Sequence, residues 1–144
     1  MAGRGRADEM PTDLPLMDAL AQVSFRVMAI LTQVGARHDL SLTHVRLLAI
    51  LRDREPRMSD LADHLGLDRS TVSGLIDRAE ERGLVRRIVD QEDRRSWRVG
   101  LTAKGRSLAA KGSREIASHI DMLSEELSAG QRAELARLLA RLLR

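Results

Sequence analysis

The fold is decided by residues 67–101, which read LDRSTVSGLIDRAEERGLVRRIVDQEDRRSWRVGL. Asp68 is a favourable N-cap residue, and the apolar residues after it recur at helical spacing. Gly83 then ends this helix. Two runs of roughly alternating residues follow, 85–88 and 97–101, and the polar turn between them leads into Arg94 and Arg95. A helix that fits a major groove, followed by an arginine-tipped hairpin, predicts contact with duplex DNA at two neighbouring grooves.

The composition of the 144 residues limits the class of protein. The length fits one domain with a modest core. We find no start typical of a secretory signal and no apolar run long enough to span a membrane, so we expect a cytoplasmic protein without a membrane partner. The sequence contains no cysteine, which excludes disulfides, thiolate zinc sites and cysteine redox switches.

The basic residues are almost all arginines, and they are concentrated on the predicted hairpin. Lys104 and Lys111 are the only lysines among 24 basic residues, and the net charge is only +3. Residues 82–98 contain six arginines and three acidic residues, whereas the helix before them is close to neutral. Arginine suits phosphates and guanine edges, so this placement favours nucleic acid. Two alternatives to nucleic-acid binding would also explain these arginines: a genome that favours arginine, or a charged run that only keeps the protein soluble.

Helices are predicted on the N-terminal side of residues 67–101. Residues 1–13 are small and polar and predict a disordered tail. Apolar periodicity predicts a helix over 14–38, a second helix capped by Thr43 and a third capped by Ser59. Gly66 makes the turn into the helix that Asp68 caps, and this spacing is that of a helix-turn-helix.

Two more helices are predicted after the hairpin. Thr102 can cap a long helix that runs to about Leu127, and Ser128 with Gln131 forms a capping box for the last helix. The last helix has leucines along one face, which pack either on the chain's own core or on a second copy. We favour a dimer, because pairing two copies buries the apolar faces of the first and last helices together.

The expected fold is therefore mainly α with a small β-hairpin wing. A winged helix-turn-helix DNA-binding domain occupies 39–102, and dimerisation helices occupy 14–38 and 103–144. The order of these elements resembles the multiple antibiotic resistance regulator (MarR) family of bacterial transcription factors. The similar segments are LADHLGL (61–67), STVS (70–73), LIDR (75–78), ERGLV (81–85), DRR (93–95) and VGLTAKG (99–105).

The resemblance covers about residues 14–143, and its wing segments look like the family's Asp-x-Arg tip and Leu-Thr-x-x-Gly strand exit. It implies a homodimer with two DNA-binding lobes, a palindromic operator, and repression relieved by a small ligand. Family members often line the ligand cleft with aromatic residues, but Phe25 and Trp97 are the only ones here. A ligand would therefore meet mainly aliphatic walls. The candidates are Phe25, Met28, His44, Leu47 and Leu48, with ordinary core as the alternative for each.

The candidate DNA-binding residues lie on the capped helix and on the wing. Short hydroxyls on the helix can reach phosphates or base edges, and Gly74 permits a close approach. We expect Arg95 to enter a minor groove and Asp93 to orient Arg95 or its neighbour by a charge-assisted bond. The other wing arginines are expected to contact phosphates: Arg86, Arg87, Arg94 and Arg98. Arg78 either binds phosphate or braces an acidic neighbour within the helix. The full set is Arg69, Ser70, Thr71, Ser73, Gly74, Arg78, Arg86, Arg87, Asp93, Arg94, Arg95 and Arg98.

Three further interpretations complete the sequence analysis. Trp97 is expected to anchor the hairpin in the core, because an exposed indole is costly. Some members of the family bind zinc near the junction of the second and fifth helices, so His44 and His119 could meet, but no histidines have metal-ligand spacing and we expect neither metal nor cofactor. We find no catalytic arrangement and expect no enzyme. A ligand-responsive repressor is the leading hypothesis, and a winged-helix protein-interaction module or a metal-responsive regulator is the alternative.

Overall fold

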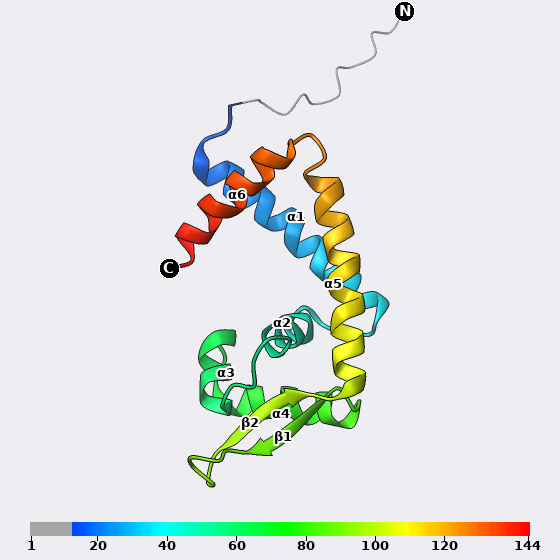
Figure 1. The fold of residues 1–144 in the computed structure, drawn as a ribbon, viewed down its shortest axis with the longest axis vertical. Helices are drawn as coiled ribbons and strands as arrows, with labels where there is room; N and C mark the ends of the chain where they lie inside the picture. Colours follow the sequence, from blue (N-terminus) through cyan, green and yellow to red (C-terminus); the bar gives the residue numbers. More distant parts are fainter. Residues whose placement is uncertain (1–12) are drawn as a thin grey trace, which may run out of the picture.

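The computed structural model describes residues 13–144, so the tail predicted over 1–13 lies outside the described residues except for Asp13. Figure 1 shows two levels, and we name each by its elements. The helical platform consists of α1, α5 and α6, and the winged head consists of α2, α3, α4 and the hairpin β1–β2. The bounds are α1 Leu16–Arg37, α2 Leu42–Leu51, α3 Met58–Leu65, α4 Arg69–Glu81, β1 Val85–Val89, β2 Trp97–Leu101, α5 Ala103–Leu123 and α6 Ala129–Leu142.

The turns around α4 agree with the sequence analysis. The Asp68 side chain accepts a hydrogen bond from the Thr71 backbone N–H at 2.8 Å and so caps the helix. Gly66 and Gly83 have φ angles of +66° and +70°, a left-handed conformation that favours glycine. Both glycines therefore end their helices as predicted.

The predicted caps of α2 and α3 were each wrong by two residues. Ser41 caps α2, because its Oγ accepts the backbone N–H of His44 at 3.3 Å, and Thr43 lies within the first turn. Arg57 stands at the N-cap of α3 without a side-chain cap, and Ser59 is inside the helix. Arg57 forms an antiparallel bridge with Arg98, so the sheet edge holds the start of α3 in place of a hydroxyl.

The core lies in the winged head, between α2, α3, α4 and the hairpin. Its buried residues include every residue predicted to face inward from α3 and α4: Leu61, Ala62, Leu65, Val72, Leu75, Ile76 and Ala79. The hairpin joins it through Val85 and Leu101, which pair directly across the two strands, and through Val99. Trp97 does not join it, since 46% of its surface is exposed. The predicted core anchor was therefore wrong, because the core residues of β2 end at Val99, two residues after Trp97.

The junction from the wing to the platform is tightly packed. Thr102 caps α5 as predicted, and its Oγ accepts the backbone N–H of Gly105 at 3.0 Å. A Cβ atom at Gly105 would lie only 1.9 Å from the carbonyl oxygen of Leu84. The capping box of Ser128 and Gln131 is present at the start of α6. Ser124 is the C-cap of α5, so the helix ends earlier than the predicted Leu127.

Helix α1 corrects one expectation. Its 22 residues are long and apolar enough to cross a membrane by length and composition alone. The sequence analysis found no such run because Asp18, Arg26 and Arg37 interrupt the segment, yet most of the helix lies between these charges. A helix whose apolar surface packs against other protein meets the same criteria.

Candidate DNA-binding surface and effector cavity

The N-terminal turn of α4 is organised by Asp68. Besides capping the helix, its carboxylate accepts the Ser70 hydroxyl at 2.7 Å and the Thr71 hydroxyl at 2.9 Å. The backbone N–H of Thr71 and these two hydroxyls lower the pKa of Asp68 to about 2. The hydroxyls of Ser70 and Thr71 are therefore hydrogen-bonded to Asp68 within the chain.

The remaining α4 candidates differ in exposure along the helix. Arg69 and Arg78 are exposed, and Ser73 and Gly74 are half-buried. A Cβ atom at Gly74 would lie 3.4 Å from the Arg78 guanidinium, so this side chain lies over the glycine. Neither arginine makes an ion pair within residues 13–144. Of the two alternatives for Arg78, the brace to an acidic neighbour is therefore absent there.

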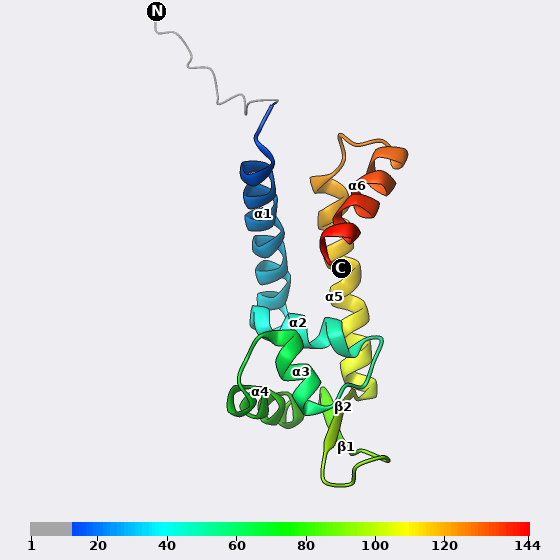
Figure 2. The same cartoon turned by 90° about the vertical axis from the view of Figure 1, so that its left-hand side faces the viewer.

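The wing turn presents Arg94 and Arg95. Figure 2 shows the hairpin projecting beside α4 at the end of the molecule far from α6. Both arginines are exposed, and within the described chain their guanidinium groups have no partner. Asp93 accepts the backbone N–H of Arg95 at 3.0 Å, so it shapes the turn through the main chain and not through the guanidinium group.

Arg87 braces the hairpin against α4. Its guanidinium group pairs with Asp77 at 2.6 Å and with Glu80, which also accepts the Arg87 backbone N–H at 3.1 Å. The arginine is half-buried between these carboxylates. Its geometry is that of a structural brace and differs from the free phosphate contact that the sequence predicted. Arg86, on the opposite face, lies 3.8 Å from Glu55 and stays exposed.

A buried carboxylate, which the sequence analysis did not identify, fixes the base of the wing turn. Asp90 is fully buried and lies 2.6 Å from Arg57 Nε and 3.1 Å from Arg98 Nε. It also accepts the Glu92 backbone N–H at 2.8 Å. This N–H and the Arg57 guanidinium lower the pKa of Asp90 to about 2, against the opposing effect of burial. Arg98, predicted as a phosphate contact, is thus held at the base of the wing turn. The one sign of this ion pair in the sequence is that acidic residues lie among arginines there.

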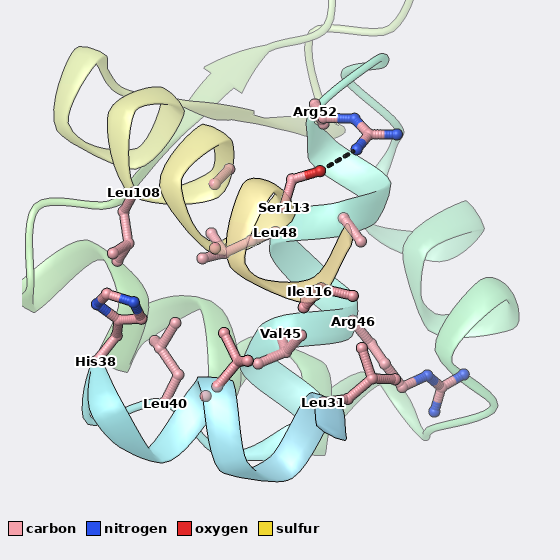
Figure 3. Close-up of a pocket in the computed structure, with 15 residues that line it drawn as sticks. Leu31, His38, Leu40, Val45, Arg46, Leu48, Arg52, Leu108, Ser113 and Ile116 are labelled. Atoms are coloured by element: carbon pink, nitrogen blue, oxygen red, sulfur yellow. Dashed lines mark hydrogen bonds between the residues drawn. The ribbon is translucent and has the colours of Figure 1, made fainter. Parts of the chain in front are cut away.

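An apolar cavity of about 260 Å³ lies between the platform and the winged head (Figure 3). It is lined by residues of α1, α2 and α5, among them Leu31, Leu48, Leu108 and Ile116. Polar groups stand among them: Arg52 donates a hydrogen bond to Ser113 Oγ at 3.1 Å, and the His38 imidazole is 3.0 Å from Glu115. The walls carry no Phe, Tyr or Trp, in keeping with the aliphatic lining expected.

Only one of the predicted ligand-binding residues lines this cavity. Leu48 does, whereas Leu47 is fully buried in the core and Phe25 is 71% exposed on α1. Met28 is exposed on α1 as well. His44 is in the first turn of α2, with its Nδ1 2.7 Å from Ser41 Oγ and its Nε2 buried without a partner among the described residues.

The same histidine does not form a metal site within the described chain. Burial, together with the charges of Arg78 and Arg82, lowers the pKa of His44. No group of three or more metal-ligating side chains occurs in residues 13–144. The pairing of His44 with His119, which the sequence analysis weighed and disfavoured, is not among the observed contacts there.

Comparisons with known proteins agree with this geometry. A family model described as "MarR family" matches residues 38–96. The HTH-type transcriptional regulator YfiV of Bacillus subtilis, itself uncharacterised, is 32% identical over 111 residues, which cover 69% of each protein. The homoprotocatechuate degradative operon repressor of Escherichia coli is 28% identical over 123 residues, which cover 84% of this chain and 82% of the repressor.

A solved structure of the transcriptional repressor CouR bound to a 23-mer DNA duplex has a TM-score of 0.75. The CouR chain is 30% identical to this chain, and the aligned region covers 90% of this chain and 93% of the CouR chain. These relatives are regulators of transcription, in agreement with the expectation that the chain is no enzyme. The chain belongs to the MarR family of winged helix-turn-helix, DNA-binding transcriptional regulators.

Proposed function

We propose that this protein is a cytoplasmic homodimer that represses transcription from a palindromic operator and releases it when a small molecule binds. The observation that carries the proposal is that unpaired charges and exposed apolar side chains occupy different parts of the surface. Unpaired arginines lie at the winged end of the chain, apolar side chains lie over the platform, and a cavity lies between the two levels.

The DNA contacts divide between α4 and the wing. Exposed Arg69 and Arg78, with the short side chains between them, suit the major groove, where α4 lies close to phosphates and base edges. Arg95 suits the neighbouring minor groove, because a narrow groove attracts a guanidinium group, and Arg94 suits a phosphate. Arg87 and Arg98 keep the hairpin in place through their carboxylate partners.

The dimer is formed by residues 14–38 and 103–144, and residues 39–102 bind the DNA. Large apolar side chains are exposed along α1 and α6, including Phe25, Leu135 and Leu139. The start of α1 and the leucines of α6 also line a shallow apolar hollow. Covering these faces with a second copy removes them from water, and a two-fold axis then places two winged heads on one palindrome.

The effector acts through the cavity. An occupant there touches the platform through α1 and α5 and the winged head through α2, so it can change how the two levels are spaced. His38 lines the cavity, and its backbone carbonyl accepts a hydrogen bond from Arg82, at the end of α4, at 2.9 Å. An occupant of the cavity therefore lies against a residue that is hydrogen-bonded to the end of α4. The volume and the apolar walls fit a small, mainly hydrophobic molecule.

Sedimentation and DNA binding test the proposal together. The full chain should sediment as a dimer, and its affinity for a duplex should fall steeply with salt because phosphate contacts release counterions. A thermal-shift screen of small aromatic acids and drugs should find compounds that raise the Tm and weaken DNA binding. A stable monomer would contradict the dimer, and salt-independent binding would contradict the arginine surface.

A further inference from the structure

The large apolar side chains that are exposed in the described chain fall into two groups. Most lie on the platform helices or at the end of α6, where the proposed dimer would cover them. The remaining two are Val89 and Trp97, which are 42% and 46% exposed. They stand directly opposite each other in the antiparallel register of the hairpin, so their side chains are neighbours on one face. We call these two residues the wing apolar pair.

The wing apolar pair lies on the face of the hairpin that packs against the winged head. Val99 and Leu101, two and four residues after Trp97, point to this face and are buried in the core. Arg87, two residues before Val89, reaches Asp77 of α4. Because side chains alternate between the faces of a strand, the pair continues this face outward, past the edge of the core and beside α4.

The described chain covers the pair only in part, and the proposed dimer leaves the rest exposed as well. The hairpin turn is at the end of the molecule far from α6 (Figure 1). An indole is a large apolar group, and leaving nearly half of it in water is unfavourable. The acidic residues of the turn are already engaged, since Glu92 pairs with Arg57 at 2.8 Å and Asp93 accepts the Arg95 backbone N–H. The pair is thus apolar and bordered by unpaired arginine.

We propose that the wing apolar pair is a DNA contact, in which Trp97 and Val89 pack on deoxyribose at the edge of the minor groove that the wing enters. The inference rests on the proposed function. Deoxyribose is the apolar surface between successive phosphates, and minor-groove proteins place apolar side chains against sugars and base steps. Arg94 and Arg95 bind the negatively charged DNA, and the wing apolar pair supplies an apolar contact on the side of the hairpin that faces α4.

The optical properties of the chain allow a direct test. Trp97 is the only tryptophan and the chain has no tyrosine, so tryptophan emission reports this residue alone. The full-length protein is titrated with a duplex that it has selected from a randomised library, and acrylamide quenching is measured. We expect quenching to fall about threefold or more on binding, as water is excluded from the indole. Unchanged quenching, while anisotropy of the labelled duplex shows binding, would overturn the inference alone.

Variants separate the apolar contact from the charged one. Trp97→Gln should weaken binding about tenfold without changing the salt slope, and Trp97→Phe should recover most of the loss. Arg94→Ala is the matched comparison on the same turn, and it should reduce the salt slope by about one. Equal Tm values for the Trp97 variants and the wild type establish that the fold is intact.

Wild-type affinity in Trp97→Gln would show that the indole contributes nothing to DNA binding and would overturn the inference. If the wild-type protein binds no duplex at all, the proposed function fails and the inference fails with it. The two failures are therefore distinguishable, because the first leaves the DNA binding of the wild type unaltered.

Discussion

Gly105 and Gly112 lie two turns apart on α5, and the same substitution should act on them with opposite sign. At Gly105, a Cβ atom would lie 1.9 Å from the carbonyl oxygen of Leu84. Real Cβ contacts are essentially never shorter than 3.0 Å, so the two atoms must separate by at least 3.0 − 1.9 = 1.1 Å. At Gly112, nothing lies within 4 Å of the added atom.

The magnitude follows from what the displacement disturbs. The Leu84 carbonyl accepts the backbone N–H of Thr102 at 3.1 Å, which joins the wing to the first turn of α5. Losing this hydrogen bond costs about 1 kcal/mol and overpacking costs about 1–3 kcal/mol, while alanine returns about 1 kcal/mol of helix propensity. Gly105→Ala should therefore lower the free energy of unfolding by about 1–3 kcal/mol, and Gly112→Ala should raise it by about 1 kcal/mol.

Thermal unfolding followed by circular dichroism measures both changes. All samples need one fixed chain concentration, because dimerisation makes the Tm depend on concentration. At about 2–4 °C per kcal/mol for a chain of this size, Gly105→Ala should unfold about 2–12 °C below the wild type. A Tm for Gly105→Ala at or above that of the wild type would refute the close packing of the wing base against α5.

Three further predictions concern the surface, the cap and the dimer. Arg95→Ala should weaken DNA binding by about 1–3 kcal/mol in anisotropy titrations, most strongly where the flanking DNA is rich in A and T; an equal loss on every sequence would make it a plain phosphate contact. Asp68 has its pKa lowered from 3.8 to about 2, so it stabilises the fold above pH 4 and loses this contribution as the pH falls toward 2. Urea midpoints of Asp68→Asn should therefore fall less over that range than those of the wild type, and parallel curves would contradict the cap. Leu139→Asp should shift the sedimentation equilibrium toward monomer, and an unchanged dimer would place the interface elsewhere.

The elements of the winged head were predictable from the sequence because local rules determine them. Asp68, Gly66 and Gly83 act through backbone hydrogen bonds and φ angles that depend on the residue type, so their roles follow from the sequence. The apolar periodicity of α3 and α4 identified the core for the same reason. The N-cap of α3 was missed because a contact between Arg57 and Arg98, 41 residues apart, replaces the local cap.

The candidate site was less predictable because it depends on which charges meet in space. Arg87 and Arg98 look like Arg94 and Arg95 in the sequence, yet the fold gives the first two carboxylate partners and leaves the second two exposed. Asp90 lies in the polar turn by sequence, and its ion pairs with Arg57 and Arg98 form only in the fold. Trp97 was placed in the core by its hydrophobicity, although the core ends before the strand does.

The central claim is that two winged heads, held together by the platform, bind one palindrome. The most direct measurement is a footprint of the full-length protein on a duplex that it has selected, together with the number of chains bound per duplex. Our account predicts two protected half-sites about one helical turn apart and two chains per duplex. Protection of a single half-site by one chain would contradict it.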